Sequence, residues 1–558
     1  MRNYSDQMKK TKRKLEDLYN NDLIFSVSLN ILFLLIAVFL FRPFFEENDD
    51  THLAMISEGV YGSREAHLIY INIILGYLYK IMLCILPSIR WYSVIQYLFI
   101  FISFTGITYV LLKRKHGRLL STLFVSACFY ELYISLQYTK TSAFVASAGY
   151  VLLFEYLKTT DMEKKERKLL VTGTILLAFS FMLRDTVFLM ITPFWGLAAL
   201  YDIYKKKKIK NYILTFIPAF IIIAVAYCAN TVAYDSDPEW RSFLVFNKAR
   251  TQATDYRYDL FDYSSHKDLL DSRNVSENDA LLLLTYQFGD DRVMNIDFFE
   301  GVVDNGPARK VNTELIKALC KNIYDTFYIV SPVLILLITA LFIYALKKIK
   351  FPFFVIICAF AGFCYFQYSG RWSHRLVFAV VLSVLTLLVY MLPDPGAEQE
   401  NRVLGALNIS FVLVLIMLMG TLAGNRFAYN KYMRSDPDFR AELDYMNRNK
   451  DTLFAIDTFT FQDKCKYDVF KAMDQGSMDN IVACGTWFTN CPVTKELCGR
   501  YGYVNPFEAL EKGSGNVILV DNIYPDQKAL FLSEHSGRTY TAEYIDSHNG
   551  FKNYRMVL

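Results

Sequence analysis

The chain has few charged residues and lacks the fingerprints of soluble nucleotide-binding proteins. Asp, Glu, Lys and Arg make up 20% of its 558 residues, and the formal net charge is only +4. There is no GxGxxG turn, no P-loop and no DxD motif in a soluble segment, and no tandem repeat or low-complexity tract stands out. These absences argue against a protein that takes a transferred group directly from a soluble nucleotide. We also expect no nucleic-acid partner.

Long apolar runs are what the chain has instead. Hydrophobic residues make up 53% of it and aromatic residues 16%, and runs of about 18 apolar residues can cross a bilayer core of roughly 30 Å. The first run follows polar residues and is expected to be a retained signal anchor rather than a cleaved peptide. The sequence predicts a polytopic α-helical membrane protein with about eleven spans, at 23–41, 91–112, 119–136, 142–157, 169–183, 186–201, 212–227, 327–346, 351–368, 376–392 and 404–423.

Clusters of Lys and Arg indicate which loops face the cytoplasm. KKTKRK precedes the first span, and KRKHGR, EKKERK, KKKKIK and KKIK follow later ones; short loops of this kind stay inside. All five clusters lie on one side only if the apolar stretch 67–87 does not cross, so we predict an interfacial or re-entrant helix there. An ordinary span that breaks the charge rule is the alternative. The expected protein sits in the plasma membrane with a cytoplasmic N-terminus.

This topology divides the chain into three parts. Residues 1–22 form a cytoplasmic segment, 23–424 form the transmembrane domain with outer loops at 42–90 and 233–325, and 425–558 lie outside the cell. The last part holds five strand-like runs (TLFAIDT, NIVACGTW, NVILVDN, TYTAEYI and YRMVL) and predicts a small extracytoplasmic α/β domain. Its cysteines, Cys465, Cys484, Cys491 and Cys498, match no firm zinc pattern and are either free thiols or form one or two disulfides.

The first outer loop, FRPFFEENDDTHLAMISEGVYG, gathers four acids where a span ends: Glu46, Glu47, Asp49 and Asp50. A carboxylate at this boundary is suited to act as a general base for a hydroxyl group arriving from water, close to a lipid headgroup. Asp49 and Asp50 begin an amphipathic pattern that predicts a helix lying along the interface. The plainer interpretation is that an Asp caps this helix, which stabilises it by about 1 kcal/mol.

The segment NDDTHLAMISEGVYG, followed by the apolar HLIYINIILGYLYK, resembles the first outer loop of the GT-C glycosyltransferases. These include protein O-mannosyltransferases and lipid A aminoarabinose transferases, whose loop carries an Asp-Asp, Asp-Glu or Glu-x-Asp motif. The resemblance covers residues 20–425, with Asp49 and Asp50 at the motif position. A donor-side pattern of Lys and Tyr found in some members has no clear counterpart here.

The resemblance implies an inverting glycosyltransferase. A sugar would pass from a polyprenyl-phosphate donor to a cell-envelope glycan, lipid or protein on the outer face. Asp49 would be the base, and Asp50 would position it or exchange roles with it. Phosphate is a good leaving group, so no cofactor or metal is obligatory, although a divalent metal is compatible with the scheme.

Basic residues at two predicted outer tips are candidates for holding the donor phosphate: Arg184 in FSFMLRDTVF, and Arg371, His374 and Arg375 in QYSGRWSHRLVF. The last three share one face if that segment is helical. Arg offers a planar fork of donors that suits phosphate. The alternatives are snorkelling to headgroups and, for Arg184, a simple pair with Asp185.

Weaker candidates for substrate contacts are Glu47, His52, Trp240, Asn247 and Arg250. Gln137, Tyr138 and Lys140 form a third outer tip, and Glu131 is an ionisable residue inside a span, to which we assign no role. Two other functions stay open: a transporter or flippase of lipid-linked saccharides, and a non-catalytic envelope scaffold. The transporter is disfavoured because the chain shows no internal symmetry and no paired broken helices.

Overall fold

The computed structural model describes residues 21–159, 166–206, 209–327, 331–393, 400–460, 467–513 and 515–558, and within helix α19 it leaves out the side chains of 427–436. The predicted cytoplasmic segment, its KKTKRK cluster and Cys465 lie outside the described residues, apart from positions 21 and 22.

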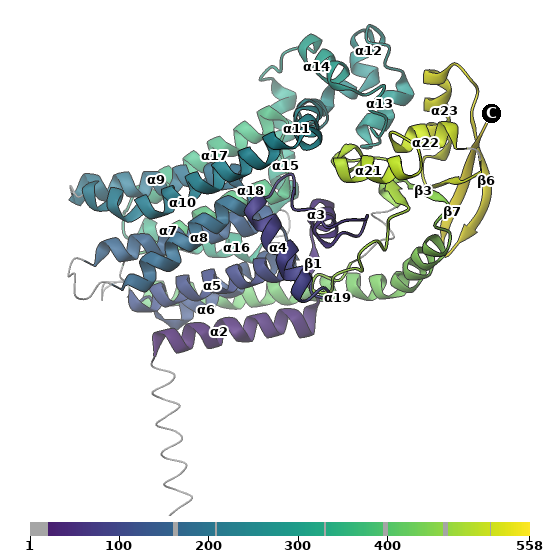
Figure 1. The fold of residues 1–558 in the computed structure, drawn as a ribbon. Helices are drawn as coiled ribbons and strands as arrows, with labels where there is room; N and C mark the ends of the chain where they lie inside the picture. Colours follow the sequence, from purple (N-terminus) through teal and green to yellow (C-terminus); the bar gives the residue numbers. More distant parts are fainter. Residues whose placement is uncertain are drawn as a thin grey trace, which may run out of the picture.

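Apolar helices form an elongated bundle, and a separate α/β domain stands at one end of it (Figure 1). Polar side chains begin several of these helices: Asn21 and Gln137 each accept hydrogen bonds from two backbone amides. The bundle consists of α2 (Asp22–Ile36), α5 (Trp91–Lys113), α6 (Gly117–Phe129), α7 (Tyr138–Lys158), α8 (Arg167–Leu183), α9 (Asp185–Lys206), α10 (Ile209–Ser236), α16 (Pro332–Leu346), α17 (Phe351–Ser369), α18 (His374–Tyr390) and the first part of α19 (Glu400–Arg448).

Within the described part of the chain, six helices are long and apolar enough to cross a membrane, and a bent helix pair raises the number to seven if it is one span. This supports a multi-pass membrane protein. Other predicted spans coincide with helices that are shorter or more polar. In α7, every side chain from Tyr138 to Glu155 is buried, so its Ser, Thr and Gly residues meet neighbouring helices rather than lipid. The number eleven stays a prediction.

The basic segments gather at one end of the bundle. Successive helices run in opposite directions, which places the described residues 113–118, 166–168, 205–206, 209–210 and 347–350 at the end away from the α/β domain. At that end Arg114 lies over the Tyr390 ring, 4.8 Å from its centroid. The opposite end is called the domain end below.

The stretch 67–87 forms the short helix α4 (Ile73–Ile85) at the domain end. Before it, the Asn72 amide donates to the Met182 carbonyl at 2.8 Å, and after it, the Arg90 amide donates to the Phe470 carbonyl of the C-terminal part at 2.9 Å. Both ends of this segment therefore lie at the same end of the bundle, and α4 does not traverse it.

Helix α3 (Asn48–Glu58) differs from the expectation of an interfacial amphipathic helix. Nearly all its side chains are buried, and Leu53 and Ile56 are at most 1% exposed. It lies between the bundle and the C-terminal domain (Figure 1), because that domain covers the face that would otherwise meet the interface.

The long loop at 233–325 is mostly helical and packs above the domain end (Figure 1). Its elements are α11 (Pro238–Thr251), a π-helical turn (Gln252–Tyr256), a 3-10 turn (Tyr258–Phe261), α12 (Tyr263–Asp271), α13 (Glu277–Leu284), α14 (Ile296–Asn305) and α15 (Thr313–Phe327).

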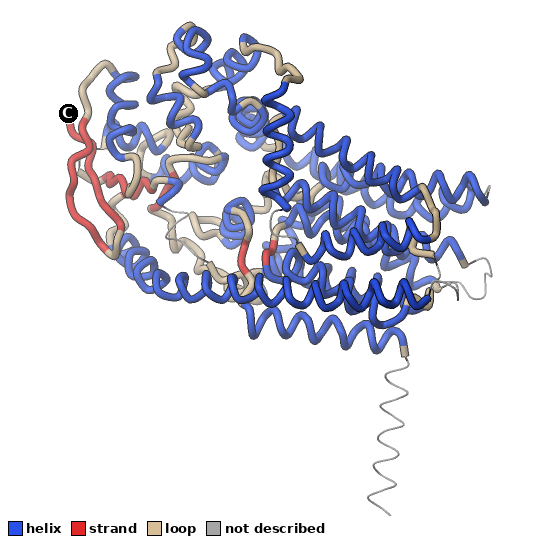
Figure 2. Tube along the Cα trace, turned by 180° about the vertical axis from the view of Figure 1, so that it is seen from behind, coloured by secondary structure: helices blue, strands red, loops and turns tan. Residues whose placement is uncertain are grey.

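The C-terminal domain is built on a five-stranded sheet, seen at the far side from the bundle in Figure 2. Its strands are β3 (Leu453–Ile456), β4 (Ile481–Ala483), β5 (Val517–Val520), β6 (Thr541–His548) and β7 (Phe551–Val557), in the order β4-β3-β5-β7-β6. The first three strands are parallel and β7 is antiparallel to β5. Each strand overlaps one of the five predicted runs. Helices α21 (Pro492–Arg500), α22 (Pro506–Lys512) and α23 (Pro525–Ser536) complete the domain.

Buried charge stabilises the sheet edge of this domain. Asp457 and Asp521 follow the neighbouring strands β3 and β5, and the buried Lys528 ammonium lies 2.8 Å and 2.6 Å from their carboxylates. Cys484, Cys491 and Cys498 are buried free thiols.

Candidate active site

The acidic loop is fixed in place by a small parallel strand pair. β1 (Phe44–Phe45) pairs with β2 (Ser135–Leu136), which precedes α7. Glu47 occupies the N-cap position of α3, and Gly59 ends the helix at a φ of 75° that disfavours residues with a Cβ. Asp49 and Asp50 therefore stand in the first helical turn, and their carboxylates turn to other elements rather than capping the helix.

Asp49 is held by two donors from distant parts of the chain. Arg375 Nη1, at the start of α18, donates to its Oδ2 at 2.7 Å, and Trp487 Nε1 of the C-terminal domain donates to its Oδ1 at 2.9 Å. Burial acts to raise the pKa of Asp49, but the Arg375 charge and the two hydrogen bonds outweigh it and lower that pKa below its ordinary value. Asp49 is thus an ionised carboxylate.

Asp50 has the opposite environment. It is fully buried, and its Oδ1 accepts from the Tyr92 hydroxyl at 2.8 Å and from the Tyr138 amide at 3.2 Å, whereas its Oδ2 has no partner among the described residues. Burial raises the pKa of Asp50 well above its ordinary value, and the neighbouring Asp49 charge adds to the shift. Two adjacent acids in different protonation states are typical of sites that assign them different tasks.

Glu46 belongs to a compact charged cluster beside the pair. Its carboxylate contacts the buried Lys140 ammonium and accepts from Ser135 Oγ at 3.0 Å, and His374 Nδ1 lies 2.9 Å from its Oε1. Lys140 also lies 2.7 Å from Glu131 Oε2. Burial opposes ionisation, but Lys140 and His374 lower the pKa of Glu46 to about 2.

The same cluster bears on metal binding. Glu46, Glu131 and His374 present ligand atoms within 4.8 Å of one another. The Lys140 ammonium already bridges the two carboxylates, and a cation there would compete with it. In the structure the cluster is an ion-pair network, with the Lys140 ammonium between the carboxylates of Glu46 and Glu131.

Arg184 faces the site from the turn between α8 and α9. Its guanidinium lies over the rings of Tyr70 and Tyr138, 4.4 Å and 5.3 Å from their centroids, and its charge acts on Asp49. Its Nε has no hydrogen-bond partner in the part of the chain that the structure describes. Asp185 is the first residue of α9, and its Oδ1 accepts from the Thr186 amide at 2.6 Å. The suggested Arg184–Asp185 ion pair is not formed among the residues that the structure describes.

The basic group at 371–375 does not form one helical face, because α17 ends at Ser369 with Gly370 as its C-cap, and α18 begins only at His374. The three side chains instead meet three different carboxylates. Arg371 Nη1 lies 2.9 Å from Asp255 Oδ2, while His374 and Arg375 contact Glu46 and Asp49 as described.

The weaker candidates of the long loop are mostly structural. Arg250 is buried, lies 3.1 Å from Asp255, and donates to Asn247 Oδ1 at 2.8 Å. Trp240 is 2% exposed and stacks on His67 with centroids 5.3 Å apart. These side chains support the loop above the site rather than presenting an open sugar-binding surface.

Glu47 and His52 flank the pair on α3. Burial raises the pKa of the half-buried Glu47 and lowers the pKa of His52 to about 4. The His52 ring stacks on Phe488 with centroids 4.8 Å apart. Glu47 is thus a second carboxylate in reach of the same space, whereas His52 packs in the interface with the C-terminal domain.

Sequence reasoning missed two residues that contact the acid pair, Tyr92 and Trp487. Tyr92 lies in an ordinary-looking apolar span, and Trp487 lies 438 positions after Asp49. The only local signal was the GTWFTN turn after a predicted strand, which by itself does not identify a partner.

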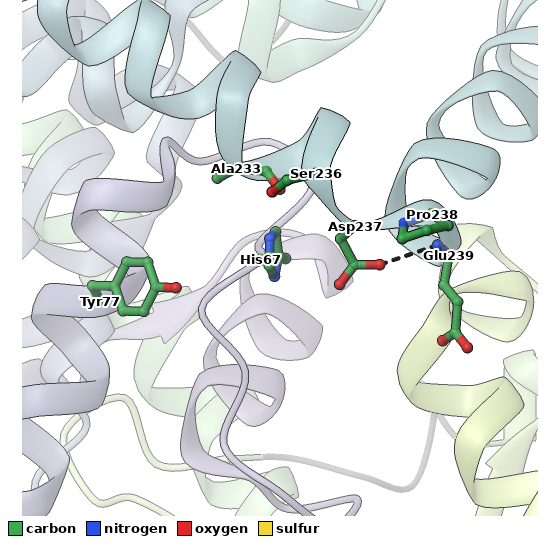
Figure 3. A pocket seen from close by; sticks show the side chains of 7 residues that line it. All are labelled: His67, Tyr77, Ala233, Ser236, Asp237, Pro238 and Glu239. Carbon is green, nitrogen blue, oxygen red and sulfur yellow. Dashed lines mark hydrogen bonds between the residues drawn. The ribbon is translucent and has the colours of Figure 1, made fainter.

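A shallow open pocket of about 570 Å³ lies at the corner between α4, α10 and α11 (Figure 3). It is lined by His67, Tyr77, Ala233, Ser236, Asp237, Pro238 and Glu239. Asp237 turns back to its own helix and accepts from the Glu239 amide at 3.0 Å. The acids of α3 are not among the lining residues, so this pocket is separate from the site.

The fold is similar to the crystal structure of ArnT from Cupriavidus metallidurans in the apo state. The two share 11% sequence identity over 95% of this chain and 97% of that chain, with a TM-score of 0.40. No protein-family model matches the chain, and no curated protein matches its sequence. A likeness this loose transfers no residue roles, so the chemistry of the site follows from its own geometry.

Proposed function

We propose that the protein is a membrane glycosyltransferase of the GT-C type. It would transfer a sugar from a polyprenyl-phosphate donor to a cell-envelope glycan, lipid or protein acceptor at the domain end of the bundle. The observation that supports this best is the pair of neighbouring carboxylates in opposite environments: Asp49 pairs with Arg375, whereas Asp50 is enclosed by Tyr92 and Tyr138. The first environment lowers the pKa of its acid and the second raises it.

Asp49 is the proton acceptor in this proposal. As the acceptor oxygen attacks the anomeric carbon, the bond from that carbon to phosphate breaks and the hydroxyl proton passes to a carboxylate. Asp50 is enclosed by Tyr92 and Tyr138, and its burial raises its pKa and so favours the protonated form. It therefore fixes the first turn of α3, and Asp49 is the member free to accept the proton.

Arginines supply the phosphate contacts. Arg184 has an Nε that no described residue engages. His374 and Arg375 stand at the start of α18, and Arg371 lies three residues before it. A donor phosphate that takes hydrogen bonds from Arg375 would weaken the Arg375–Asp49 pair. Asp49 would then become a stronger base as the donor binds. The scheme needs no metal ion, because the leaving phosphate is neutralised by side chains.

The first test compares envelope glycans and lipid-linked sugars in cells with and without the protein. Cells lacking it should accumulate the lipid-linked donor and lose one glycan modification. We expect Asp49→Asn to abolish the restored modification, a loss of at least about a hundredfold in rate. Asp50→Asn should retain most of it, because an amide resembles the protonated acid.

Two outcomes would redirect the proposal. Transfer that persists in Asp49→Asn and disappears in Glu47→Gln, with both variants expressed normally, would assign the base to Glu47. If neither substitution affects transfer, and donor instead accumulates on only one leaflet of cells lacking the protein, the transporter would be the better description.

A further inference from the structure

Trp487 brings the C-terminal domain into direct contact with the proposed base. Its indole Nε1 donates to Asp49 Oδ1 at 2.9 Å, and the side chain is 4% exposed. Arg375 occupies the other carboxylate oxygen from the bundle side. The two oxygens of Asp49 are therefore held by two different parts of the molecule.

The turn that carries Trp487 is fixed independently of Asp49. Thr486 adopts a φ of 68°, and its amide donates to the Tyr286 carbonyl at 2.8 Å. A Cβ at Gly485 would meet that same carbonyl oxygen at 2.1 Å. The Asn490 side chain donates to the Phe288 carbonyl at 3.1 Å. The indole is thus aimed at Asp49 by the long loop and the sheet edge, not by Asp49 alone.

A second set of contacts ties the same domain to the other end of α3. The Gly476 and Met478 amides donate to the Gly59 and Val60 carbonyls, each at 2.9 Å. The Met473 amide donates to the buried Glu58 carboxylate at 3.0 Å. Both ends of α3 are therefore bound to the C-terminal domain, so that the orientation of its first turn depends on that domain.

We propose that Trp487 is a positioning residue for Asp49, and that the C-terminal domain thereby completes the active site instead of serving as an accessory. This inference rests on the proposed role of Asp49 as the base. The indole N–H keeps the carboxylate in one rotamer. Its removal leaves Arg375 as the sole side-chain donor to Asp49 among the described residues.

The N–H also affects the basicity of Asp49. A hydrogen bond to the ionised form stabilises that form, so that loss of the indole donor raises the pKa of Asp49. Other charged or titratable groups act on the same carboxylate and stay in place in the variant. They are Glu47 before α3, Asp50 and His52 of α3, Tyr70 before α4, Tyr138 of α7, Arg184 and Arg375.

The test uses Trp487→Phe, which keeps an aromatic ring and removes the donor. The matched control is Trp195→Phe, because Trp195 is also buried and its Nε1 donates to Ser383 Oγ at 3.0 Å inside the bundle, away from the acids. Full-length proteins in detergent receive the lipid-linked sugar extracted from cells that lack the protein, with membranes of those cells as acceptor.

We expect Trp487→Phe to lower kcat by about ten- to a hundredfold with little change in KM for the lipid-linked sugar, as for a lost hydrogen bond to a charged group. The acidic limb of its pH–rate profile should move to higher pH. Trp195→Phe should keep the wild-type profile. A wild-type kcat and acidic limb in Trp487→Phe would overturn the inference.

Asp49→Asn in the same assay separates the two proposals. An inactive Asp49→Asn together with a normal Trp487→Phe rejects only the positioning role, whereas an active Asp49→Asn rejects the base itself. If Trp487→Phe does not fold, Trp487→His serves instead, because imidazole offers a smaller N–H donor. Trp487→His should keep the acidic limb of its pH–rate profile at the wild-type pH. A limb that moves although this N–H donor is present would contradict the inference.

Discussion

At the scale of single residues, the acid pair shows how two identical side chains acquire different chemistry. Asp49 and Asp50 are consecutive in one helical turn, so their side chains point about 100° apart. One meets a guanidinium and an indole N–H, and the other meets a tyrosine hydroxyl inside the protein. Charge neutralisation favours the ionised form in the first case, and burial favours the protonated form in the second.

Asp50 should make the stability of the protein depend on pH. Its pKa is raised by burial in the folded state, so folding binds a proton that the unfolded chain releases above a pKa of about 3.9. Stability from this group is fully present below the unfolded pKa and is lost as pH rises toward the folded pKa. Asp50→Asn removes this pH-dependent contribution to the stability of the folded protein.

Thermal unfolding in detergent at about pH 5 and pH 8 tests this linkage. The midpoint of Asp50→Asn relative to the wild type should rise between the two pH values. A difference that is constant, or that falls with pH, would mean that Asp50 is ionised in the folded protein.

At the scale of secondary-structure elements, the Lys140 network joins four pieces of chain. Glu46 follows β1 and Glu131 lies in the π-helical turn Tyr130–Ile134. Lys140 lies in the first turn of α7, and His374 begins α18. Lys140 is fully buried and faces two carboxylates. The network thus holds the acidic loop against the bundle and fixes where α3 starts.

Lys140→Met should be strongly destabilising, by about 3–5 kcal/mol, because it leaves buried carboxylates without their cation. Removing one of those charges as well, in Lys140→Met with Glu131→Gln, should recover part of the loss. Thermal unfolding of both variants measures this. Wild-type stability of Lys140→Met alone would show that the two acids are solvated or protonated rather than paired.

At the scale of the whole molecule, the charge pattern and the helix directions agree on one arrangement. The described basic segments lie at one end of the bundle, and the C-terminal domain lies at the other (Figure 1). If the positive-inside rule holds, the acids of α3, the arginines at the start of α18 and Trp487 all face outward.

Cysteine labelling in intact cells tests this orientation. In a background with the exposed Cys84, Cys228 and Cys320 changed to Ser, Arg538→Cys on the C-terminal domain should react with a membrane-impermeant maleimide, and Lys350→Cys at the start of α17 should react only after lysis. The reverse pattern would place the acids in the cytosol and remove the lipid-linked donor from the proposal.

The sequence alone determined that this is a multi-pass membrane protein and that Asp49 and Asp50 lie in the first turn of a helix after the first apolar run. Apolar runs, basic loops and alternating strand patterns are local signals, which is why the helices, the strands of the C-terminal sheet and the short helix α4 could be placed from them. The motif residues Asp49 and Asp50 and the basic group Arg371, His374 and Arg375 were found in the same way, from their position next to predicted spans.

Tertiary structure decided what each of these residues contacts. The packing of distant segments decides that Asp49 meets Arg375 and that Asp50 is enclosed by Tyr92. It also brings Trp487, 438 positions after Asp49, into contact with the site. The protonation state of an acid follows from burial and from charges within a few ångströms. Neither the burial of an acid nor the charges around it can be read from its neighbours in the sequence.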